Sequence, residues 1–409
     1  MTRKISLYIS YLAAFLMPFY IFRFEYSIFK TNIFEIIVLL SFFFLILYLC
    51  QSKKKVENLG LLPFALLALS FIAIFLAEDK IKAIGIFKGW FLIPAIYAFI
   101  VANLFDSKSV TKLSLPIFIS VLIVSIWALL QRFGLLTAIF YQANVPEISE
   151  YLSISSNRVI GPFDSPNFLA MYLVPGLFLS IPTFFLFRKK IIRIVVCLLA
   201  VIPLAAIIMS ASRAGIIALV ASIGLILIAI IIRQKNRLTI IVAASLIGLA
   251  ILFVGYFSFF DKTRLDSNNS RMKIYTYSLE MIREKPLTGI GLGSYHSKIS
   301  QISKNDQPFQ LYVLDYALHP HNLFLAMWLN LGFFGLAVFI LIVGYFYWQN
   351  RELYKYETQK IAYLLAMSAI LIHGLFDTTY FKNDLSAIFW LTLAFTVIEN
   401  RDKIKKRSS

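Results

Sequence analysis

The chain has 409 residues, 60% of them hydrophobic and 15% charged, and its mean hydropathy is +0.80. This composition excludes an ordinary soluble globular protein, in which about 25% of residues are charged. The formal net charge of +18 would suggest nucleic acid as a partner of a soluble protein, but in a membrane protein it belongs mostly to the loops that orient the helices, so no nucleic-acid partner is expected.

Apolar stretches of bilayer length recur along the whole chain. A helix needs roughly 17 to 25 residues to cross a bilayer, and long continuous apolar runs favour helices over a β-barrel. The sequence therefore predicts an all-α polytopic membrane protein that forms one domain over residues 1–409. About twelve stretches qualify as spans, near residues 6–22, 31–50, 59–77, 84–104, 113–133, 166–187, 191–210, 214–232, 238–260, 322–347, 361–380 and 385–399.

The positive charges of the short loops predict the orientation of these spans. Basic runs at residues 53–55, 188–190, 233–237 and 401–407 fall on one side, which the positive-inside rule makes cytoplasmic. Both termini are then expected inside. The basic start of the chain precedes an apolar run without a small-residue cleavage site, so we interpret it as a retained first helix and not as a signal peptide.

Two outer segments are long, residues 134–165 and residues 261–320 between spans nine and ten. Long ordered loops usually carry function. The second contains a stretch that suits an amphipathic helix ended by Pro286. It is followed by the glycine-rich turn of residues 289–295, which is either a simple turn or one that brings backbone amides to a phosphate or a sugar.

Polar residues lie at the start of an expected membrane helix in residues 318–335, L-H-P-H-N-L-F-L-A-M-W-L-N-L-G-F-F-G. Proline suits the first turn of a helix, so the helix is expected to begin at about Pro320, with His321 in its first turn. The positive end of the helix dipole disfavours imidazolium, so His321 is expected to stay neutral. A neutral imidazole can act as a general base.

Three helices are expected to start on the outer side, after residues 165–167, after residues 210–215 and at residues 319–322, and helix N-termini favour anions such as phosphate. Ser212 is a plausible N-cap, and Arg213 either marks a site or extends to the lipid headgroups. Arg271 is either a ligand-binding residue or a solvated one. Arg158 either clamps a ligand or pairs with Asp164.

The remaining titratable groups give weaker signals. His296, His319 and His321 lie in the outer loop and His373 near the outer end of a span. Zinc needs three or four ligands, no HExxH occurs, and the two cysteines have no CxxC spacing, so neither a metal ion nor another cofactor is expected. His373 and Asp377 are spaced to pair on one helix face, in either a structural or a catalytic role.

Four of these motifs resemble the O-antigen ligase and polymerase superfamily of bacterial envelope glycosyltransferases. The stretch His321-Asn322, nine residues and then G-F-F-G is similar to the pattern of the ligases. The likeness extends to S-R-A-G at residues 212–215, to Arg271 followed by G-I-G-L-G, and to G-P-F-D-S-P-N-F-L-A at residues 161–170. Its core covers about residues 155–380.

The resemblance implies a GT-C-like fold and an inverting, metal-independent transfer of a glycan from undecaprenyl pyrophosphate to an acceptor hydroxyl. The reaction would take place on the periplasmic face of the bacterial inner membrane, with a lipid A-core sugar as the acceptor in a ligase. His321 would be the base, and Arg213 and Arg271 would hold the pyrophosphate. Asn322 and His319 would orient the base or the acceptor.

Three other functions stay open. The same chemistry serves repeat-unit polymerases, whose acceptor is another lipid-linked glycan, and protein O-oligosaccharyltransferases. A polysaccharide flippase or transporter is an alternative of another class, but transporters place ionisable groups or broken helices near mid-membrane. Here the polar residues gather at the outer helix ends, which favours an enzyme.

Overall fold

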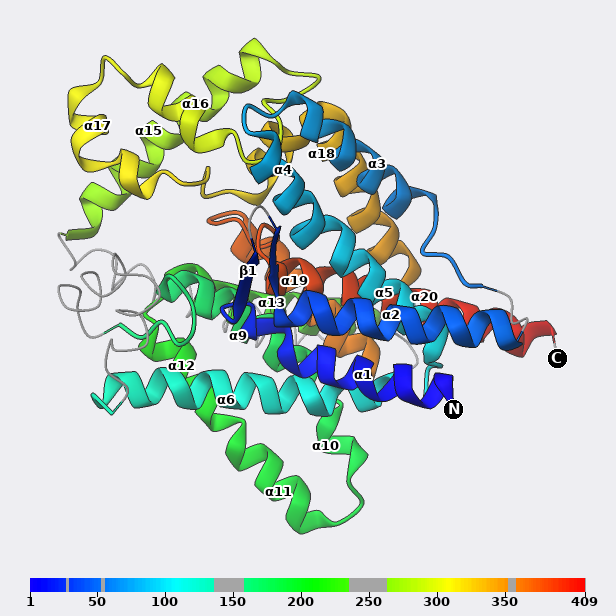
Figure 1. Ribbon diagram of the computed structural model, residues 1–409. Helices are drawn as coiled ribbons and strands as arrows, with labels where there is room; N and C mark the ends of the chain where they lie inside the picture. Colours follow the sequence, from blue (N-terminus) through cyan, green and yellow to red (C-terminus); the bar gives the residue numbers. More distant parts are fainter. Residues whose placement is uncertain (27–28, 53–55, 136–157, 235–262, 352–357, 409) are drawn as a thin grey trace.

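The computed structural model describes residues 1–26, 29–52, 56–135, 158–234, 263–351 and 358–408 (Figure 1). Helices dominate these ranges. The sheet structure described there is one short antiparallel hairpin, in which β1 (Arg23–Tyr26) pairs with β2 (Phe29–Asn32). The fold agrees with the expected all-α class.

Six helical stretches are long and apolar enough to cross a membrane. They comprise α2 (Ile33–Ser52), Lys80–Leu104 (α4, Lys80–Ile86; η2, Phe87–Leu92; α5, Ile93–Leu104), Val110–Arg132 (η3, Val110–Leu113; α6, Ser114–Arg132), Pro166–Leu186 (α9, Pro166–Ser180; α10, Thr183–Leu186), Lys190–Met209 (α11, Lys190–Leu199; α12, Val201–Met209) and α18 (Leu323–Gln349). Two shorter apolar helices are α3 (Leu61–Leu76) and the Arg213–Ile228 part of α13 (Arg213–Gln234). These helices indicate a membrane protein. The number twelve stays a prediction, and the span expected at residues 238–260 lies outside the described residues.

The remaining helices complete a bundle in which distant parts of the chain pack together. These helices are α1 (Thr2–Leu16), α19 (Thr358–Gly374) and α20 (Asn383–Ser408). Helix α1 packs on α2, α20 on α5, and α19 on both α13 and α9. Both chain ends lie at the same end of the bundle (Figure 1), which is the arrangement that two cytoplasmic termini require.

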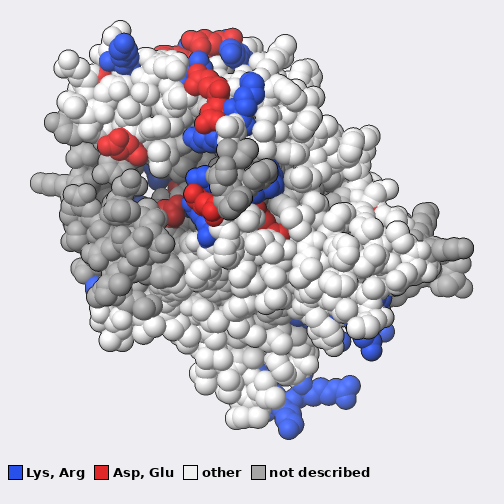
Figure 2. All heavy atoms as spheres, viewed as in Figure 1, with Lys and Arg blue, Asp and Glu red and all other residues white. Residues whose placement is uncertain are grey.

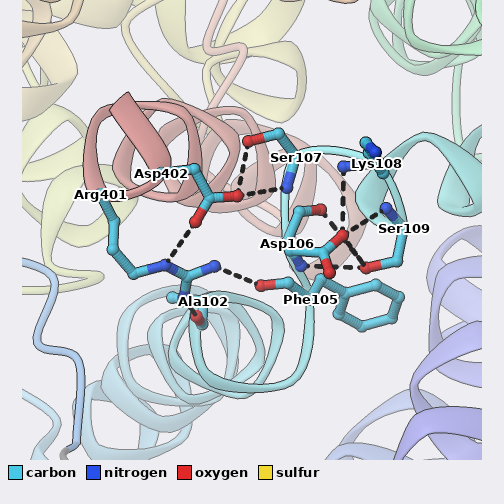
Figure 3. A network of polar contacts seen from close by, with 8 residues as sticks. All are labelled: Ala102, Phe105, Asp106, Ser107, Lys108, Ser109, Arg401 and Asp402. Carbon is cyan, nitrogen blue, oxygen red and sulfur yellow. Dashed lines mark hydrogen bonds and ion pairs between the residues drawn. The ribbon is translucent and has the colours of Figure 1, made fainter. Parts of the chain in front are cut away.

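Helix α20 is anchored at this end by one arginine (Figure 3). The Arg401 guanidinium donates to the carbonyl oxygens of Ala102 and Phe105, both at 2.6 Å, and thereby satisfies acceptors at the C-terminal end of α5. The neighbouring Asp402 carboxylate accepts from the Ser107 backbone N–H at 2.8 Å and from its hydroxyl at 2.7 Å. This network joins the last helix to the loop between α5 and α6.

A small outer lobe lies beside the bundle, built from α15 (Thr263–Glu284), α16 (Tyr295–Ile302) and α17 (Gln307–Tyr312) (Figure 1). The helix expected before Pro286 is therefore present as α15. The lobe has its own apolar core, which includes Ile274, Met281, Ile299 and Phe309 and extends to Leu329 of α18. The lobe is thus packed onto the outer part of α18.

The glycine-rich turn of residues 289–293 inserts into a break in α18. The break is at Gly332, whose φ of +73° is left-handed. The Phe333 N–H donates to the Pro286 carbonyl at 3.1 Å, and the Ile290 N–H donates to the Leu329 carbonyl at 2.7 Å. Backbone groups that the break would leave unpaired are therefore satisfied by the turn, as apolar surroundings require.

Glycine is required on both sides of this contact. A Cβ on Gly332 would lie 2.0 Å from the Leu287 carbonyl oxygen, and a Cβ on Gly289 would lie 2.4 Å from that of Leu329. The Gly293 N–H donates to the Asn330 side chain at 3.1 Å, and the Leu292 N–H to the Ala73 carbonyl at 3.3 Å. Because these amides are used inside the protein, the turn seats the outer lobe and does not form an anion cradle.

Candidate active site

Helix α18 begins at Leu323 and is capped by Asn322. The Asn322 side-chain oxygen accepts from the backbone N–H groups of Phe324 at 2.9 Å and Leu325 at 3.0 Å, and its Nδ2 donates to the Leu375 carbonyl at 3.0 Å. The expectation that the helix begins at about Pro320 with His321 in its first turn is therefore wrong. Asn322 has the extended conformation of an N-cap (φ −157°), and His321 before it is left-handed (φ +46°).

Asp377 brings the two histidines together from the loop that follows α19. Its carboxyl group is 3% exposed, and Oδ1 lies 3.4 Å from His321 Nδ1 and 3.6 Å from His319 Nδ1. Oδ1 also accepts from the Thr378 N–H at 2.9 Å, and Oδ2 accepts from Asn167 Nδ2 at 3.1 Å. Asn167 belongs to the first turn of α9, so three distant segments meet at one carboxylate.

Sequence reasoning missed this role of Asp377, which it placed beside His373 on one helix face. The structure ends α19 at Gly374, so Asp377 is a loop residue. One signal in the sequence could have indicated this role. Asp377 is an acidic residue at the end of an apolar stretch, where a buried charge needs a functional or structural reason. Its partners could not be deduced from local spacing.

Burial and neighbouring charges decide the protonation of this cluster. Burial acts to raise the pKa of Asp377, but the adjacent His321, followed by His319 and His373, holds it well below its ordinary value. Burial, followed by the neighbouring His321, lowers the pKa of His319 to about 3. At neutral pH the cluster therefore contains an ionised Asp377 and a neutral His319.

The position of the carboxylate favours one tautomer of His321. Nδ1 faces the ionised Asp377 and is stabilised there when it carries the proton. Nε2 is then the nitrogen with a lone pair. This is the tautomer that a general base needs, with the carboxylate positioned to stabilise the imidazolium that forms.

Aromatic contacts extend the cluster to a lysine. The His319 ring packs edge-on against Phe168, with centroids 5.8 Å apart, and against His321 at 4.3 Å. The Lys382 ammonium lies 3.6 Å from the Phe168 centroid and forms an ion pair with Asp164. Of the two alternatives for Arg158, pairing with Asp164 is not observed among the described residues, where the partner of Asp164 is Lys382.

Arg213 is the first residue of α13, where the chain turns between two apolar helices. The Ser212 hydroxyl accepts from the Gly215 N–H at 3.3 Å, so the expected N-cap is present. A Cβ on Gly215 would lie 2.6 Å from that of Ala170, which shows how closely the first turns of α13 and α9 pack. Arg158 donates from Nε to the Ser210 carbonyl at 2.9 Å and thus supports the turn that precedes Arg213.

Arg271 approaches the histidines from the outer lobe. It lies on α15 one turn before Tyr275, whose hydroxyl donates to the His321 carbonyl oxygen at 3.1 Å. After burial and the nearer charges, the charge of Arg271 also contributes to the lowered pKa of His319. The structure therefore brings His319, His321, Asn322 and Arg271 into one region. Arg213 starts a helix that packs on α9 and α19, the two helices next to Asp377.

An open groove of about 420 Å³ adjoins the histidine cluster. Charged side chains gather on the upper part of the molecule and around a hollow below the outer lobe, whereas the rest of this face carries few charges (Figure 2). An apolar groove that adjoins the histidine cluster suits a ligand with a lipid part and an ionic part. The groove is lined by Tyr275, Leu279, Asn322, Phe324, Leu325, Trp328 and Leu336.

His319, His321 and Asp377 are also the residues that could hold a metal ion. Their donor atoms lie within 4.8 Å of one another, and among the described residues they form the one such group of three. Both oxygens of Asp377 already accept hydrogen bonds, from Thr378 and Asn167. Metal independence stays a prediction that a chelator can test.

Part of the chain matches the model of a known protein family. Residues 198–340, about a third of the chain, match the family model described as O-antigen ligase. The resemblance is thereby confirmed for the segment that holds Arg213, Arg271, His319, His321 and Asn322, whereas Arg158 and Asp377 lie outside it. None of the curated proteins matches the chain.

Proposed function

Starting from the O-antigen ligase family match of residues 198–340, we propose that the protein is a membrane glycosyltransferase that transfers a glycan from undecaprenyl pyrophosphate to an acceptor hydroxyl. The proposal rests mainly on one contact at the N-terminal end of α18, where the buried Asp377 carboxylate approaches His321 Nδ1. In a ligase the acceptor is a lipid A-core sugar, and the site faces the periplasm across the bacterial inner membrane.

His321 is the general base of the proposed reaction. The acceptor hydroxyl oxygen attacks the anomeric carbon of the donor sugar and forms the new glycosidic bond. The bond from that carbon to the pyrophosphate oxygen breaks, and its electron pair leaves with the polyprenyl pyrophosphate. Nε2 of His321 takes the hydroxyl proton, and Asp377 stabilises the resulting imidazolium. Attack from the face opposite the leaving group inverts the anomeric centre.

The pyrophosphate is held by positive groups of the protein. Arg213 and Arg271 supply guanidinium groups, which bind phosphate oxygens in a bidentate manner. The N-terminal turns of α9, α13 and α18 add helix-dipole fields of the same sign. Such fixed charges stabilise a leaving diphosphate without a divalent ion. Asn322 and His319 orient the base, since Asn322 fixes the first turn of α18 and His319 packs against the His321 ring.

The test is a transfer assay with purified full-length protein in lipid nanodiscs, supplied with a lipid-linked glycan donor and a lipid A-core acceptor. His321→Ala should lower the transfer rate by about 10² to 10⁴-fold while the donor remains bound. His296→Ala, a histidine of the outer lobe that is absent from the cluster, is the matched control. Unimpaired transfer by His321→Ala would reject the assignment.

Two further measurements refine the proposal. EDTA should leave the rate unchanged, and a loss that Mg²⁺ or Zn²⁺ restores would contradict a metal-independent mechanism. Deletion of the gene, followed by gel analysis of envelope glycans, separates the possible acceptors. Loss of long chains from lipid A-core, with polymer remaining on its lipid carrier, supports a ligase, whereas single capped repeats support a polymerase.

A further inference from the structure

A basic groove lies at the junction of α10 and α11. Its volume is about 530 Å³, within the range of roughly 300 to 1,000 Å³ that is common for ligand pockets. None of the residues of α11 is buried against the rest of the described protein. In Figure 1 this helix lies at the bottom, at the edge of the bundle. The groove is lined by Phe184, Arg188, Lys190, Arg193, Ile194, Cys197 and Leu198.

The groove lies far from the histidine cluster. Helix α9 begins beside the cluster, where Asn167 contacts Asp377, and runs for 15 residues before α10 leads into the groove. At 1.5 Å per residue, α9 alone covers about 22 Å. The groove and the cluster are therefore at opposite ends of this helix and face opposite leaflets of a bilayer.

The charge of the groove is one-sided. Arg188, Lys190 and Arg193 contribute three cations, and none of them forms an ion pair with an acidic residue in the described part of the chain. Figure 2 shows Lys and Arg side chains projecting at the lower tip of the molecule, with no acidic side chain visible beside them. An anion is the ligand that such a set of cations attracts.

Arg193 is already positioned for such a ligand. Its Nε donates to the Phe187 carbonyl oxygen at 2.7 Å, and its guanidinium lies over the Phe184 ring, 5.4 Å from the centroid. These contacts fix the plane of the guanidinium and use one of its five N–H groups. A preorganised guanidinium loses less conformational entropy when it binds a phosphate.

The half of the groove toward the C-terminal end of α11 is apolar. Lys190, Arg193, Ile194, Cys197 and Leu198 follow the spacing i, i+3, i+4, i+7 and i+8, so they share one face of α11. Lys190 and Arg193 lie in the first turn of this helix, and Ile194, Cys197 and Leu198 follow toward its C-terminal end. A ligand with an anionic head and a hydrocarbon tail matches this order, whereas free phosphate would use the first turn alone.

We propose that this groove binds one anionic phospholipid of the leaflet opposite the histidine cluster. The phosphate contacts Arg188, Lys190 and Arg193, and the acyl chain follows Ile194, Cys197 and Leu198. Basic pockets between membrane helices bind anionic headgroups in this manner. The site does not depend on the proposed transferase activity.

Cys197 provides a direct test, because it is an exposed free thiol that lines the groove. In full-length protein carrying Cys50→Ser, we would compare the rate of maleimide labelling in nanodiscs of phosphatidylcholine alone and of phosphatidylcholine mixed with phosphatidylglycerol. Phosphatidylglycerol should slow labelling. The effect should disappear in the triple variant Arg188→Gln, Lys190→Gln, Arg193→Gln, whose affinity for the lipid should fall by about tenfold or more.

A charge-matched variant separates a specific site from general surface attraction. Lys108→Gln, Lys112→Gln, Lys189→Gln removes the same charge outside the groove lining and should retain the slow labelling. Native mass spectrometry should likewise find phosphatidylglycerol retained by this variant and lost from the groove variant. Equal loss in both, or labelling that phosphatidylglycerol never slows, would overturn the proposal. Arg188→Gln alone changes an exposed side chain and should give a smaller loss of the same sign if the triple variant folds poorly.

Discussion

The two ends of the motif His321-Asn322-x9-Gly332 have different roles, one at the start of α18 and one at the break within it. At the start of α18, side chains meet a buried carboxylate and create a set of groups that can move a proton. Around Gly332, backbone groups of α18 form hydrogen bonds with the glycine-rich turn and so hold the outer lobe in place, with the Asn330 side chain adding one more bond. We call the part around His321 and Asn322 the chemical end of the motif, and the part around Gly332 its architectural end. Substitutions at the first should impair the reaction, and substitutions at the second should impair folding.

The largest expected effect is on the architectural end. Gly332→Ala places a Cβ 2.0 Å from the Leu287 carbonyl oxygen in a left-handed conformation, so we expect a loss of at least about 3 kcal/mol of stability and little folded protein. Thermal unfolding and gel filtration in detergent would measure this. Gly344→Ala in the same helix meets nothing within 4 Å and should be neutral or slightly stabilising. Similar melting of both variants would refute the assigned role of the break.

The next effect is on the chemical end. Asp377→Asn keeps the shape of the side chain but removes the charge that stabilises imidazolium, so the transfer rate should fall on the order of 10²-fold with little change in melting temperature. The pH profile of the rate should change as well, because the carboxylate no longer acts on His321. Asp306→Asn, which breaks an exposed pair with Lys273, is the control and should retain the rate. A normal rate for Asp377→Asn would show that Asp377 is not the positioning residue of His321.

Asn330 sharpens the comparison because it belongs to the architectural end yet acts through a side chain. Its oxygen accepts from the Gly293 N–H at 3.1 Å, and its Nδ2 donates to the Ala326 carbonyl at 2.8 Å. Asn330→Leu leaves that amide unpaired and should cost about 1 to 3 kcal/mol of stability. The rate per folded molecule should change less than the melting temperature. The opposite pattern would show that the turn itself takes part in the reaction.

The smallest effect near neutral pH is a dependence of stability on pH through His319. Its pKa of about 3 in the folded protein lies below the ordinary value of 6.5, so the unfolded chain binds the extra proton between these values. Stability should therefore fall as the pH drops from about 6.5 toward 3, with a slope of at most about 1.4 kcal/mol per pH unit from this residue. Melting temperatures of His319→Gln should decline less with acid than those of the parent. His296→Gln should decline like the parent.

The features predicted from sequence are the local ones. Eleven of the twelve expected spans fall within the described residues, and each of them contains helix. The residue type and position of Ser212 likewise predict the N-cap that the structure has. The sequence places the start of α18 about three residues too early, because Pro320 is typical of the first helical residue whereas Asn322 caps the helix. Local signals thus give the type of an element better than its boundary.

The contacts that build the site depend on tertiary structure. Nothing near Asp377 in the sequence indicates His321 as its partner, and nothing near Asp164 indicates Lys382. The glycine-rich turn can be recognised as a turn from its sequence. The break in α18 that accepts this turn depends on the left-handed conformation of Gly332, which is seen only in the structure. Such pairings form when helices distant in the chain pack together, and no periodicity within one segment encodes them.

The contact of Arg401 with the end of α5 has a consequence for mapping the topology of this protein (Figure 3). Reporter enzymes are often fused to membrane proteins that are shortened from the C-terminus, and the reporter's activity is taken to reveal the compartment. Any fusion that ends before Arg401 removes the anchor that joins the last helix to the loop after α5, and can therefore mislocate its reporter. Insertions into the intact chain, or fusions placed after Asp402, retain that anchor and are the constructions to prefer.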